Sequence, residues 1–334
     1  MNNLSKITVI GGGSWGTALA SLLAGKGYQV ALLVRNQELA CAINNQHENV
    51  RYLPGLKLPV NISAYTSPQA ALQGANVLLW AIPCQSSRKV LRELKPHLPV
   101  NPIIVSATKG IEVEHLKTVE EIVLEEISDL NPCYSALSGP SFAKEVVQQM
   151  PTAVVLACRN VELGCSLQEV FSTKYFRTYS SRDVTGVELG GAVKNVIAIA
   201  AGMTDGLGFG HNTKAALITR GLAEICRLGV ALGADVQTFM GLSGMGDLVL
   251  TCTGELSRNR HVGICLGQGQ NLDTIIKEMH MVAEGVRTAV AVNGLAAEKG
   301  VDMPITNAVC AVLDGSVKPK EAVHLLMTRT LKME

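Results

Sequence analysis

The sequence predicts an α/β domain built on a mostly parallel sheet, followed by an all-α domain. In the first half, short β-branched runs alternate with amphipathic stretches whose apolar residues recur at helical spacing. Beyond residue 181 the strand-like runs stop, and helical segments separated by Gly, Ser and Thr follow. The 334 residues are enough for two hydrophobic cores, and we place the two domains at 1–181 and 182–334.

The expected elements follow this division along the chain. Short apolar strands are expected at residues 7–10, 29–34, 77–82, 103–107, 134–137 and 153–157. Helices of the first domain are expected at 14–26 and 116–127. Helices of the second domain are expected at 184–203, 212–232, 257–266, 284–298 and 319–326.

Composition excludes several classes of protein. Hydrophobic residues make up 47% of the chain and charged residues 17%, which excludes wholesale disorder. A formal net charge of +1 provides no global field for nucleic acid or an anionic membrane. Nine scattered cysteines without a CxxC pair argue against a disulfide scaffold and against zinc, so we expect no metal. No uninterrupted apolar run suits a membrane helix, and we therefore expect a cytoplasmic protein without stable membrane insertion.

A glycine-rich turn follows the first expected strand. Gly11, Gly13 and Gly16 satisfy the pattern G-x-G-x-x-G directly after that strand and at the start of a helix. In this context the glycines permit a tight turn and the close approach of a pyrophosphate to the helix N-terminus. The sequence therefore predicts a Rossmann-type domain that binds NAD or NADP.

The residue after the second expected strand bears on the choice of cofactor. Arg35 stands where an acidic residue would bond the ribose 2′-hydroxyl of NAD. A guanidinium can instead meet a 2′-phosphate or stack on adenine, so we favour NADPH. The alternative is an ordinary surface arginine, and Glu38 nearby keeps NAD open.

Further motifs lie at residues 107–112, 138–143, 193–195, 208–214, 241–248, 257–259 and 283–285. With these motifs the chain resembles the bacterial-type NAD(P)-dependent glycerol-3-phosphate dehydrogenases over nearly its whole length. The resemblance implies reversible hydride transfer between NAD(P)H and C2 of dihydroxyacetone phosphate, giving sn-glycerol 3-phosphate for glycerophospholipid synthesis. It also implies a homodimer.

Lys194 matches the position of the family's catalytic lysine. We expect it to donate a proton to the C2 oxygen in reduction and to accept one in oxidation. The alternative is a solvated helix lysine, but no other charge lies between Glu188 and Asp205, so Lys194 is hard to solvate fully. If Lys109, Lys194 and Arg258 converge, we expect their mutual repulsion to lower the ammonium pKa.

The resemblance assigns the remaining contacts by position. Substrate contacts are expected from Lys109, Gly139, Ser141, Lys194, Asn195, Asp247, Ser257, Arg258 and Asn259, with Thr251 as a further candidate. Cofactor contacts are expected from Gly11, Gly13, Ser14, Trp15, Gly16, Arg35, Lys109, Ala143, Arg258, Val282 and Glu284.

Some of these residues also have plainer explanations. The carboxylate of Asp247 could orient Lys194 or accept from a substrate hydroxyl, but it could also cap a helix. Trp15 could be a packing residue, and Glu284 could be an acid at a helix start.

Three other reactive residues are expected to have no catalytic part. His211 lies in a glycine-rich segment, where we expect it to form hydrogen bonds within a loop. Cys84 stands where the resemblance implies serine; its oxidation could hinder cofactor binding, but we expect a substitute for serine without a redox role. Cys252 is expected to be packed and inert.

Two other functions fit parts of the pattern. A related two-domain 3-hydroxyacid or sugar-acid dehydrogenase would bind a carboxylate with the C-terminal cations. A non-catalytic NAD(P) sensor could keep the glycines, but it would not need Lys109, Lys194, Asp247 and Arg258 together. The fold alone does not separate these functions.

Overall fold

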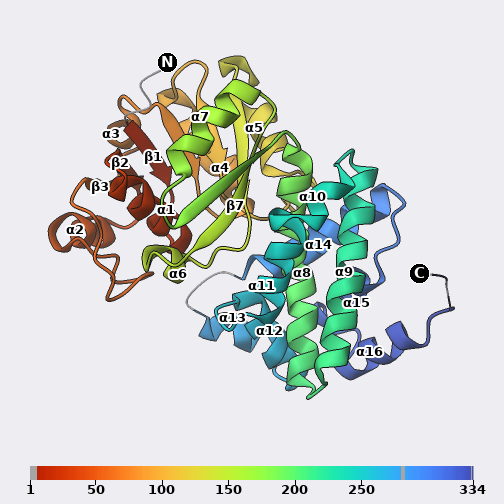
Figure 1. Ribbon diagram of the computed structural model, residues 1–334. Coiled ribbons are helices and arrows are strands. Elements are labelled where there is room, and N and C mark those ends of the chain that lie inside the picture. Colours follow the sequence, from red (N-terminus) through yellow and green to blue (C-terminus); the bar gives the residue numbers. More distant parts are fainter. Residues whose placement is uncertain (1–5, 280–282, 332, 334) are drawn as a thin grey trace. The chain divides into compact units, whose positions relative to one another are not determined.

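The computed structural model describes residues 6–279, 283–331 and 333. The chain forms two compact units (Figure 1). One comprises the chain up to Thr108 together with Thr118–Val184, and the other comprises Lys109–Lys117 together with the chain from Thr185 onward. The predicted order, a mostly parallel sheet followed by helices, is confirmed. The segment Lys109–Lys117 packs with the helical unit, although its place in the sequence predicts the first domain.

The first unit is built on an eight-stranded sheet with the order β3-β2-β1-β4-β5-β6-β7-β8. Its strands are β1 (Lys6–Ile10), β2 (Gln29–Leu33), β3 (Ile62–Tyr65), β4 (Val77–Trp80), β5 (Ile103–Ser106), β6 (Cys133–Ser138), β7 (Thr152–Cys158) and β8 (Phe176–Ser181). Neighbouring strands are parallel except β6 and β7, which pair antiparallel. Ile10 lies opposite Leu33 of β2 and Trp80 of β4, so the carboxyl ends of these strands share one edge of the sheet.

Two strands, β3 and β8, are additional to those expected from the sequence. Both lie at the edges of the sheet. In β8, Phe176 and Thr178 are buried while Arg177 and Tyr179 are exposed, and this alternation is typical of a strand with one solvated face. Their sequences, ISAY and FRTYSS, mix polar with apolar residues and therefore do not stand out as the continuous apolar runs of the central strands.

Helices cover both faces of this sheet. They are α1 (Ser14–Gly25), α2 (Gln37–Gln46), α3 (Pro68–Leu72), α4 (Cys84–Leu94), α5 (Val119–Ile127), α6 (Ala143–Val147) and α7 (Val161–Phe171), with short turns η1 (Lys95–His97) and η2 (Ser128–Leu130). α1, α6 and α7 share one core with the strands, and α4 and α5 pack against each other. α5 begins at Val119, later than predicted, because Leu116 has a φ of 57° and Thr118 forms a capping box with Glu121.

The second unit consists of helices packed around α8 (Val184–Gly206). The other helices are α9 (His211–Ala231), α10 (Val236–Met240), α11 (Asp247–Thr253), α12 (Arg258–Gly267), α13 (Leu272–Glu278), α14 (Glu284–Glu298), α15 (Pro304–Leu313) and α16 (Pro319–Met327), with the π-type turn η3 (Leu242–Gly246) before α11. Among the described residues, α8 is the one helix long and apolar enough to cross a membrane, but 94% of its apolar window is buried inside the protein. A helix that is apolar on all sides and buried is a core helix.

Glycines allow α8 and α12 to pack with their backbones in contact. A Cβ at Gly202 of α8 would lie 2.0 Å from the carbonyl oxygen of Arg260, and a Cβ at Gly263 of α12 would lie 2.0 Å from that of Ile199. Larger residues at these two positions would therefore separate the helices. This contact fixes α12 against the helix that carries Lys194.

Candidate active site

Lys194 lies on α8 with its ammonium group inside the second unit. Only 5% of the residue is exposed. Its Nζ donates to Asp247 Oδ1 at 2.7 Å and to Thr251 Oγ1 at 2.6 Å. Asp247 and Thr251 stand one turn apart on α11, and the Thr251 hydroxyl donates in turn to the Asp247 carbonyl at 2.6 Å. The ammonium group is therefore held in one orientation by two acceptors.

Lys109 binds the same carboxylate from the other side. Its Nζ donates to Asp247 Oδ2 at 2.6 Å, while the Asp247 side chain is almost fully buried. Asp247 is the first residue of α11, Gly246 occupies the capping position, and no side chain caps the helix there. The Asp247 carboxylate thus binds two lysines and does not cap the helix.

A close backbone contact brings α11 to Lys194. Gly190 precedes Lys194 by one helical turn, so both residues lie on the same face of α8. A Cβ at Gly190 would lie 2.6 Å from the carbonyl oxygen of Ser243 in η3. The absence of a side chain at Gly190 therefore lets η3, and the start of α11 behind it, approach this face of α8.

Burial changes the acidity of Lys194. The pKa of this lysine is lowered to about 8: burial is the main cause, the Asp247 carboxylate opposes the shift, and the charge of Lys109 adds to it. The lowering of this pKa agrees with the predicted direction, and repulsion by Lys109 contributes to it, but burial is the larger cause. An amine with a pKa near 8 can both donate and accept a proton at physiological pH.

The start of α12 lies beside Asn195, the residue after Lys194. Ser257 caps α12 by accepting from Arg260 N at 3.2 Å. Asn259 Oδ1 accepts from Gly285 N at 3.0 Å, and a Cβ at Gly285 would lie 2.8 Å from the Asn195 carbonyl oxygen. Ser257 and Asn259 therefore have structural tasks in addition to any contact with substrate.

Arg258 and Glu284 begin neighbouring helices of the second unit. The Arg258 side chain is exposed at the start of α12, whereas Glu284 is partly buried at the start of α14. The two charges attract each other. Val282, which the resemblance placed at the cofactor, lies outside the described residues.

The glycine turn of the first unit has the features that a dinucleotide needs. Gly11 has a φ of 113°, and a Cβ there would lie 2.6 Å from the Ala81 carbonyl oxygen. A Cβ at Gly16 would lie 2.0 Å from the Gly11 carbonyl oxygen. In contrast, a Cβ at Gly13 would meet no atom within 4 Å. Gly11 and Gly16 are thus required by the fold, while Gly13 leaves open space that fits a pyrophosphate at the start of α1.

The residues after Gly13 begin α1. Ser14 Oγ donates to the Tyr52 carbonyl at 3.0 Å. Trp15 packs against the core of this unit, as its plainer explanation predicts, but its buried Nε1 has no hydrogen-bond partner among the described residues. α1 also packs against α6, whose first residue is Ala143. An unpaired buried donor beside the glycine turn is compatible with a bound polar ligand.

Arg35 follows β2 at the carboxyl edge of the sheet. It is exposed, and none of its atoms pairs with another described residue. The next residue, Asn36, caps α2 by accepting from Leu39 N at 2.8 Å. Arg35 is therefore accessible to a ligand that binds at the carboxyl edge of the sheet.

Gly139 and Ser141 follow β6 and belong to the first unit. Gly139 has a φ of 144°, and a Cβ there would lie 2.8 Å from Val154 Cα. Ser141 Oγ donates to the Gly139 carbonyl at 2.9 Å. The predicted substrate residues thus come from both units: these two from the first, and the others from the second.

Three other reactive residues take no part in the hydrogen bonds described above. His211 is exposed and begins α9, so its expected place in a loop was wrong. Cys84 is buried at the start of α4, and burial raises the pKa of the Cys252 thiol to about 12, so that thiol is unreactive. The described residues include no group of three or more His, Cys, Asp or Glu side chains that could hold a metal ion.

Asn49 was not predicted from the sequence. It is fully buried, and its side chain bonds the Gly12 carbonyl at 2.9 Å and Thr17 Oγ1 at 2.7 Å. It stands more than 30 residues beyond the glycine turn, and no motif marks it, so only the fold brings it there.

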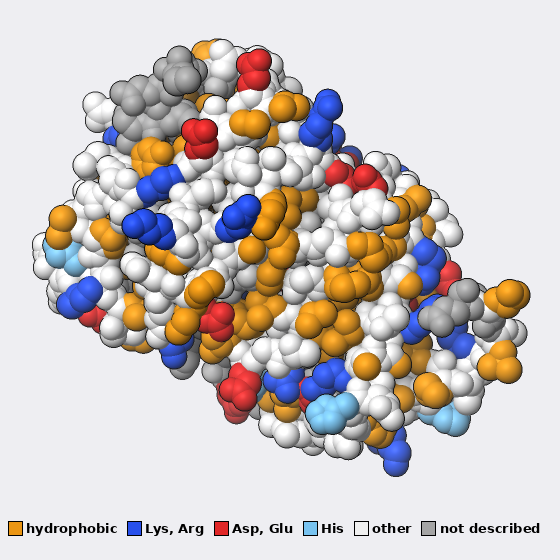
Figure 2. Space-filling model, in the orientation of Figure 1, with side chains coloured by type: hydrophobic (Ala, Val, Ile, Leu, Met, Phe, Trp, Pro, Cys, Tyr) orange, Lys and Arg blue, Asp and Glu red, His pale blue; other side chains and the backbone are white. Residues whose placement is uncertain are grey.

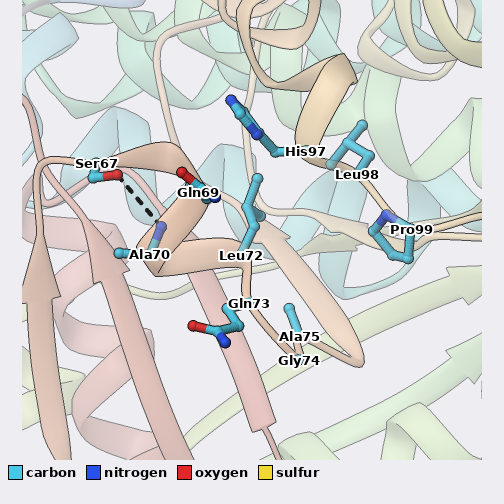
Figure 3. A pocket seen from close by; sticks show the side chains of 10 residues that line it. All are labelled: Ser67, Gln69, Ala70, Leu72, Gln73, Gly74, Ala75, His97, Leu98 and Pro99. Atoms are coloured by element: carbon cyan, nitrogen blue, oxygen red, sulfur yellow. Dashed lines mark hydrogen bonds between the residues drawn. The ribbon is translucent and has the colours of Figure 1, made fainter.

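The surface of the described residues includes a hollow in the first unit. On the face shown in Figure 2, charges of both signs are scattered among neutral side chains. A hollow of about 590 Å³ lies between α3 and η1 (Figure 3). The Ser67 side chain there accepts from Ala70 N, and His97 lies across from it. None of the predicted site residues lines this hollow.

Comparisons with known proteins agree over the whole chain. Residues 6–164 match the family model of the NAD-dependent glycerol-3-phosphate dehydrogenase N-terminus, and residues 183–324 match that of its C-terminus. A protein of Nitratidesulfovibrio vulgaris strain DP4 named glycerol-3-phosphate dehydrogenase (NAD(P)+) is 60% identical over 329 residues, which are 98% of this chain and 100% of that protein. The protein of the same name from Lawsonia intracellularis is 57% identical over 342 residues, covering 100% of this chain and 96% of that protein.

Solved structures show the same similarity. The crystal structure of glycerol-3-phosphate dehydrogenase from Coxiella burnetii superimposes with a TM-score of 0.93 at 38% identity, covering 97% of this chain and 99% of that one. A D-mandelate dehydrogenase solved with NADH has a TM-score of 0.62 at 13% identity, covering 93% of this chain and 98% of that one. The second similarity concerns the fold alone.

Proposed function

The chain belongs to the NAD-dependent glycerol-3-phosphate dehydrogenase family, and we propose that it interconverts dihydroxyacetone phosphate and sn-glycerol 3-phosphate with NADPH or NADH. The observation that carries the proposal is the buried ammonium of Lys194, which Asp247 and Thr251 hold in place. Reduction of a phosphorylated ketone needs a hydride, a proton for the carbonyl oxygen and cations for the phosphate. The residues of the two units fit these needs.

Lys194 is proposed as the general acid and base. With a pKa of about 8 it is mostly protonated at neutral pH and can donate a proton to the C2 oxygen of the ketone. In the reverse direction, neutral Lys194 accepts the proton of the C2 hydroxyl. Asp247 and Thr251 orient the amine in both directions, since each of them accepts a hydrogen bond from it.

The first unit is proposed to hold the dinucleotide. A nicotinamide supplies the hydride when it is bound. Gly13 leaves the start of α1 open, and the N-terminus of a helix favours a negatively charged pyrophosphate. Arg35 is exposed and unpaired among the described residues, so it can meet a 2′-phosphate; we therefore propose a preference for NADPH.

The substrate phosphate is proposed to bind cations of the second unit. The planar guanidinium of Arg258 can donate two parallel hydrogen bonds to a phosphate. Lys109 supplies a second positive charge and shares Asp247 with Lys194. Neutral contacts are proposed from Gly139, Ser141, Asn195, Asp247, Ser257 and Asn259.

The wider role follows from the family. We propose that the product glycerol 3-phosphate supplies glycerophospholipid synthesis, and that the protein acts in the cytoplasm as a homodimer. Burial of α8 within its own unit is consistent with this location, since the helix does not need a membrane to cover its apolar surface.

The proposal is tested by mixing the purified protein with dihydroxyacetone phosphate and following nicotinamide absorbance, with NADPH and NADH in parallel. We expect turnover in the wild type and a loss of at least about 100-fold in Lys194→Ala. Lys214→Ala is the control, since Lys214 is another lysine of this unit, partly buried, but pairs with Asp205 at 2.6 Å.

The other outcomes identify the alternatives. Turnover that survives in Lys194→Ala would keep the reaction and move the proton donor, with Lys109 next to be tested. Turnover of a hydroxy acid in place of glycerol 3-phosphate would indicate the related 3-hydroxyacid or sugar-acid dehydrogenase. Tight binding of nucleotide without turnover of any substrate would indicate a sensor.

A further inference from the structure

A compact loop after α2 contacts the glycine turn through Asn49. This side chain is fully buried and uses both of its polar atoms. Its Nδ2 donates to the Gly12 carbonyl at 2.9 Å and to Thr17 Oγ1 at 2.7 Å, and its Oδ1 accepts from Tyr52 N at 3.0 Å. Asn49 therefore links its own loop to the start of α1.

The loop is fixed independently of the glycine turn. At its base, Glu48 pairs with Lys57 at 3.5 Å and accepts from Gly55 N at 2.9 Å. Leu53 and Leu58 are buried in the core of the first unit. Because these contacts hold the loop in place, Asn49 can restrain the glycine turn, and its own position does not depend on the turn alone.

The bonds of Asn49 determine the orientation of one peptide group. The Gly12 carbonyl accepts from Asn49 Nδ2 at 2.9 Å and from Thr17 Oγ1 at 3.4 Å, so it is directed toward buried partners. In a trans peptide the carbonyl oxygen and the amide hydrogen lie on opposite sides. The amide N–H of Gly13 is therefore directed away from Asn49. A Cβ at Gly13 would meet nothing within 4 Å, so this residue borders open space.

We propose that Asn49 is a positioning residue for the dinucleotide: by holding the Gly12 carbonyl inward, it presents the Gly13 N–H and the first turn of α1 to the pyrophosphate. The inference rests on the proposed function, since it takes the ligand to be NADPH or NADH. Aspartate has the same shape as asparagine but no N–H, so Asn49→Asp would place an acceptor against the Gly12 carbonyl and remove the restraint.

The test compares Asn49→Asp with Asn61→Asp. Asn61 is a matched control in the same unit: its Nδ2 also bonds two oxygens, the carbonyl of Ala24 in the last turn of α1 at 2.8 Å and that of Tyr28 just beyond this helix at 2.6 Å. Titration with NADPH, followed by its fluorescence, is expected to show a Kd raised about tenfold in Asn49→Asp and unchanged in Asn61→Asp. At saturating NADPH, kcat of Asn49→Asp is expected to stay close to that of the wild type, which a general loss of structure would not allow.

Two results would overturn the inference: an unchanged Kd in Asn49→Asp, or an equal rise of Kd in both variants. If Asn49→Asp does not fold, Thr17→Val keeps the shape of the side chain and removes the hydroxyl bonded to Asn49 and Gly12. A raised Kd in Thr17→Val would support the inference and an unchanged Kd would overturn it. A wild type that binds no NADPH or NADH would instead contradict the proposed function, so the two failures are distinguishable.

Discussion

Replacing Lys109 by methionine is expected to move the pH dependence of catalysis through Lys194. Reduction uses protonated Lys194, so its rate should fall as pH rises through about 8, and oxidation, which uses the neutral amine, should rise over the same range. The charge of Lys109 lowers the pKa of Lys194. Removing that charge should therefore raise the pKa of Lys194. The fall of the reduction rate and the rise of the oxidation rate, the two limbs of the pH profile, should both shift to higher pH.

The size of the shift follows from the shared carboxylate. The two ammonium groups lie 2.6 Å and 2.7 Å from the opposite oxygens of Asp247. Two like charges roughly 6 Å apart at an effective dielectric constant of about 20 repel by about 3 kcal/mol, or ~2 pKa units. The side chain of Lys109 is 16% exposed, and solvent screens part of this repulsion. We therefore expect a displacement of about one pH unit.

The assay is the profile of kcat/KM against pH for both directions of the reaction, on both sides of pH 8. Lys214→Met is the control, because Lys214 pairs with Asp205 and the main causes of the lowered Lys194 pKa lie elsewhere, in burial and in the charges of Asp247 and Lys109. Asp247→Asn should move the limbs in the opposite direction, since the carboxylate raises the pKa of Lys194. Limbs that stay in place in Lys109→Met, or that move equally in Lys214→Met, would refute this electrostatic coupling.

Three further predictions concern packing, cofactor choice and phosphate binding. Gly263→Ala should lower the free energy of unfolding by at least about 2 kcal/mol, because its Cβ would lie 2.0 Å from a backbone oxygen. Gly25→Ala is the control and should not destabilise the protein, because a Cβ at Gly25 would meet no atom within 4 Å. Equal unfolding temperatures of the two variants would contradict this prediction. Arg35→Ser should raise KM for NADPH about tenfold and leave KM for NADH unchanged, and a parallel rise for both would exclude contact with a 2′-phosphate. Arg258→Lys keeps the charge but loses the planar fork, so KM for dihydroxyacetone phosphate should rise about tenfold, which initial rates would measure; an unchanged KM would remove Arg258 from the phosphate site.

Local patterns were sufficient to predict the order of the two units. The glycine turn was predictable because its conformation is a property of a few consecutive residues: Gly11 needs a positive φ, and Gly16 needs contact with the Gly11 carbonyl. The buried central strands were predictable because they are continuous apolar runs. The edge strands β3 and β8 were missed, since their pairing depends on a neighbouring strand more than on their own composition.

The chemical environment of Lys194 depended on the tertiary structure. Its residue type and its motif pointed to proton transfer, but its acceptor Asp247 stands 53 residues further along the chain and reaches it through the close approach of η3 to Gly190. Burial, the main cause of its lowered pKa, is likewise a result of packing. The sequence suggested that Asp247 could orient Lys194, but not that Lys109 binds the same carboxylate.

The sequence by itself thus determined the residues whose chemistry or backbone freedom is intrinsic: the glycines of the turn, the lysines and Arg258. Only the tertiary structure decided which of them share a partner, as Lys109 and Lys194 share Asp247, and which unremarkable residue supports the site, as Asn49 holds Gly12. The physical reason is that conformational preferences act over a few residues, whereas hydrogen bonds and burial between distant segments arise only when the whole chain packs.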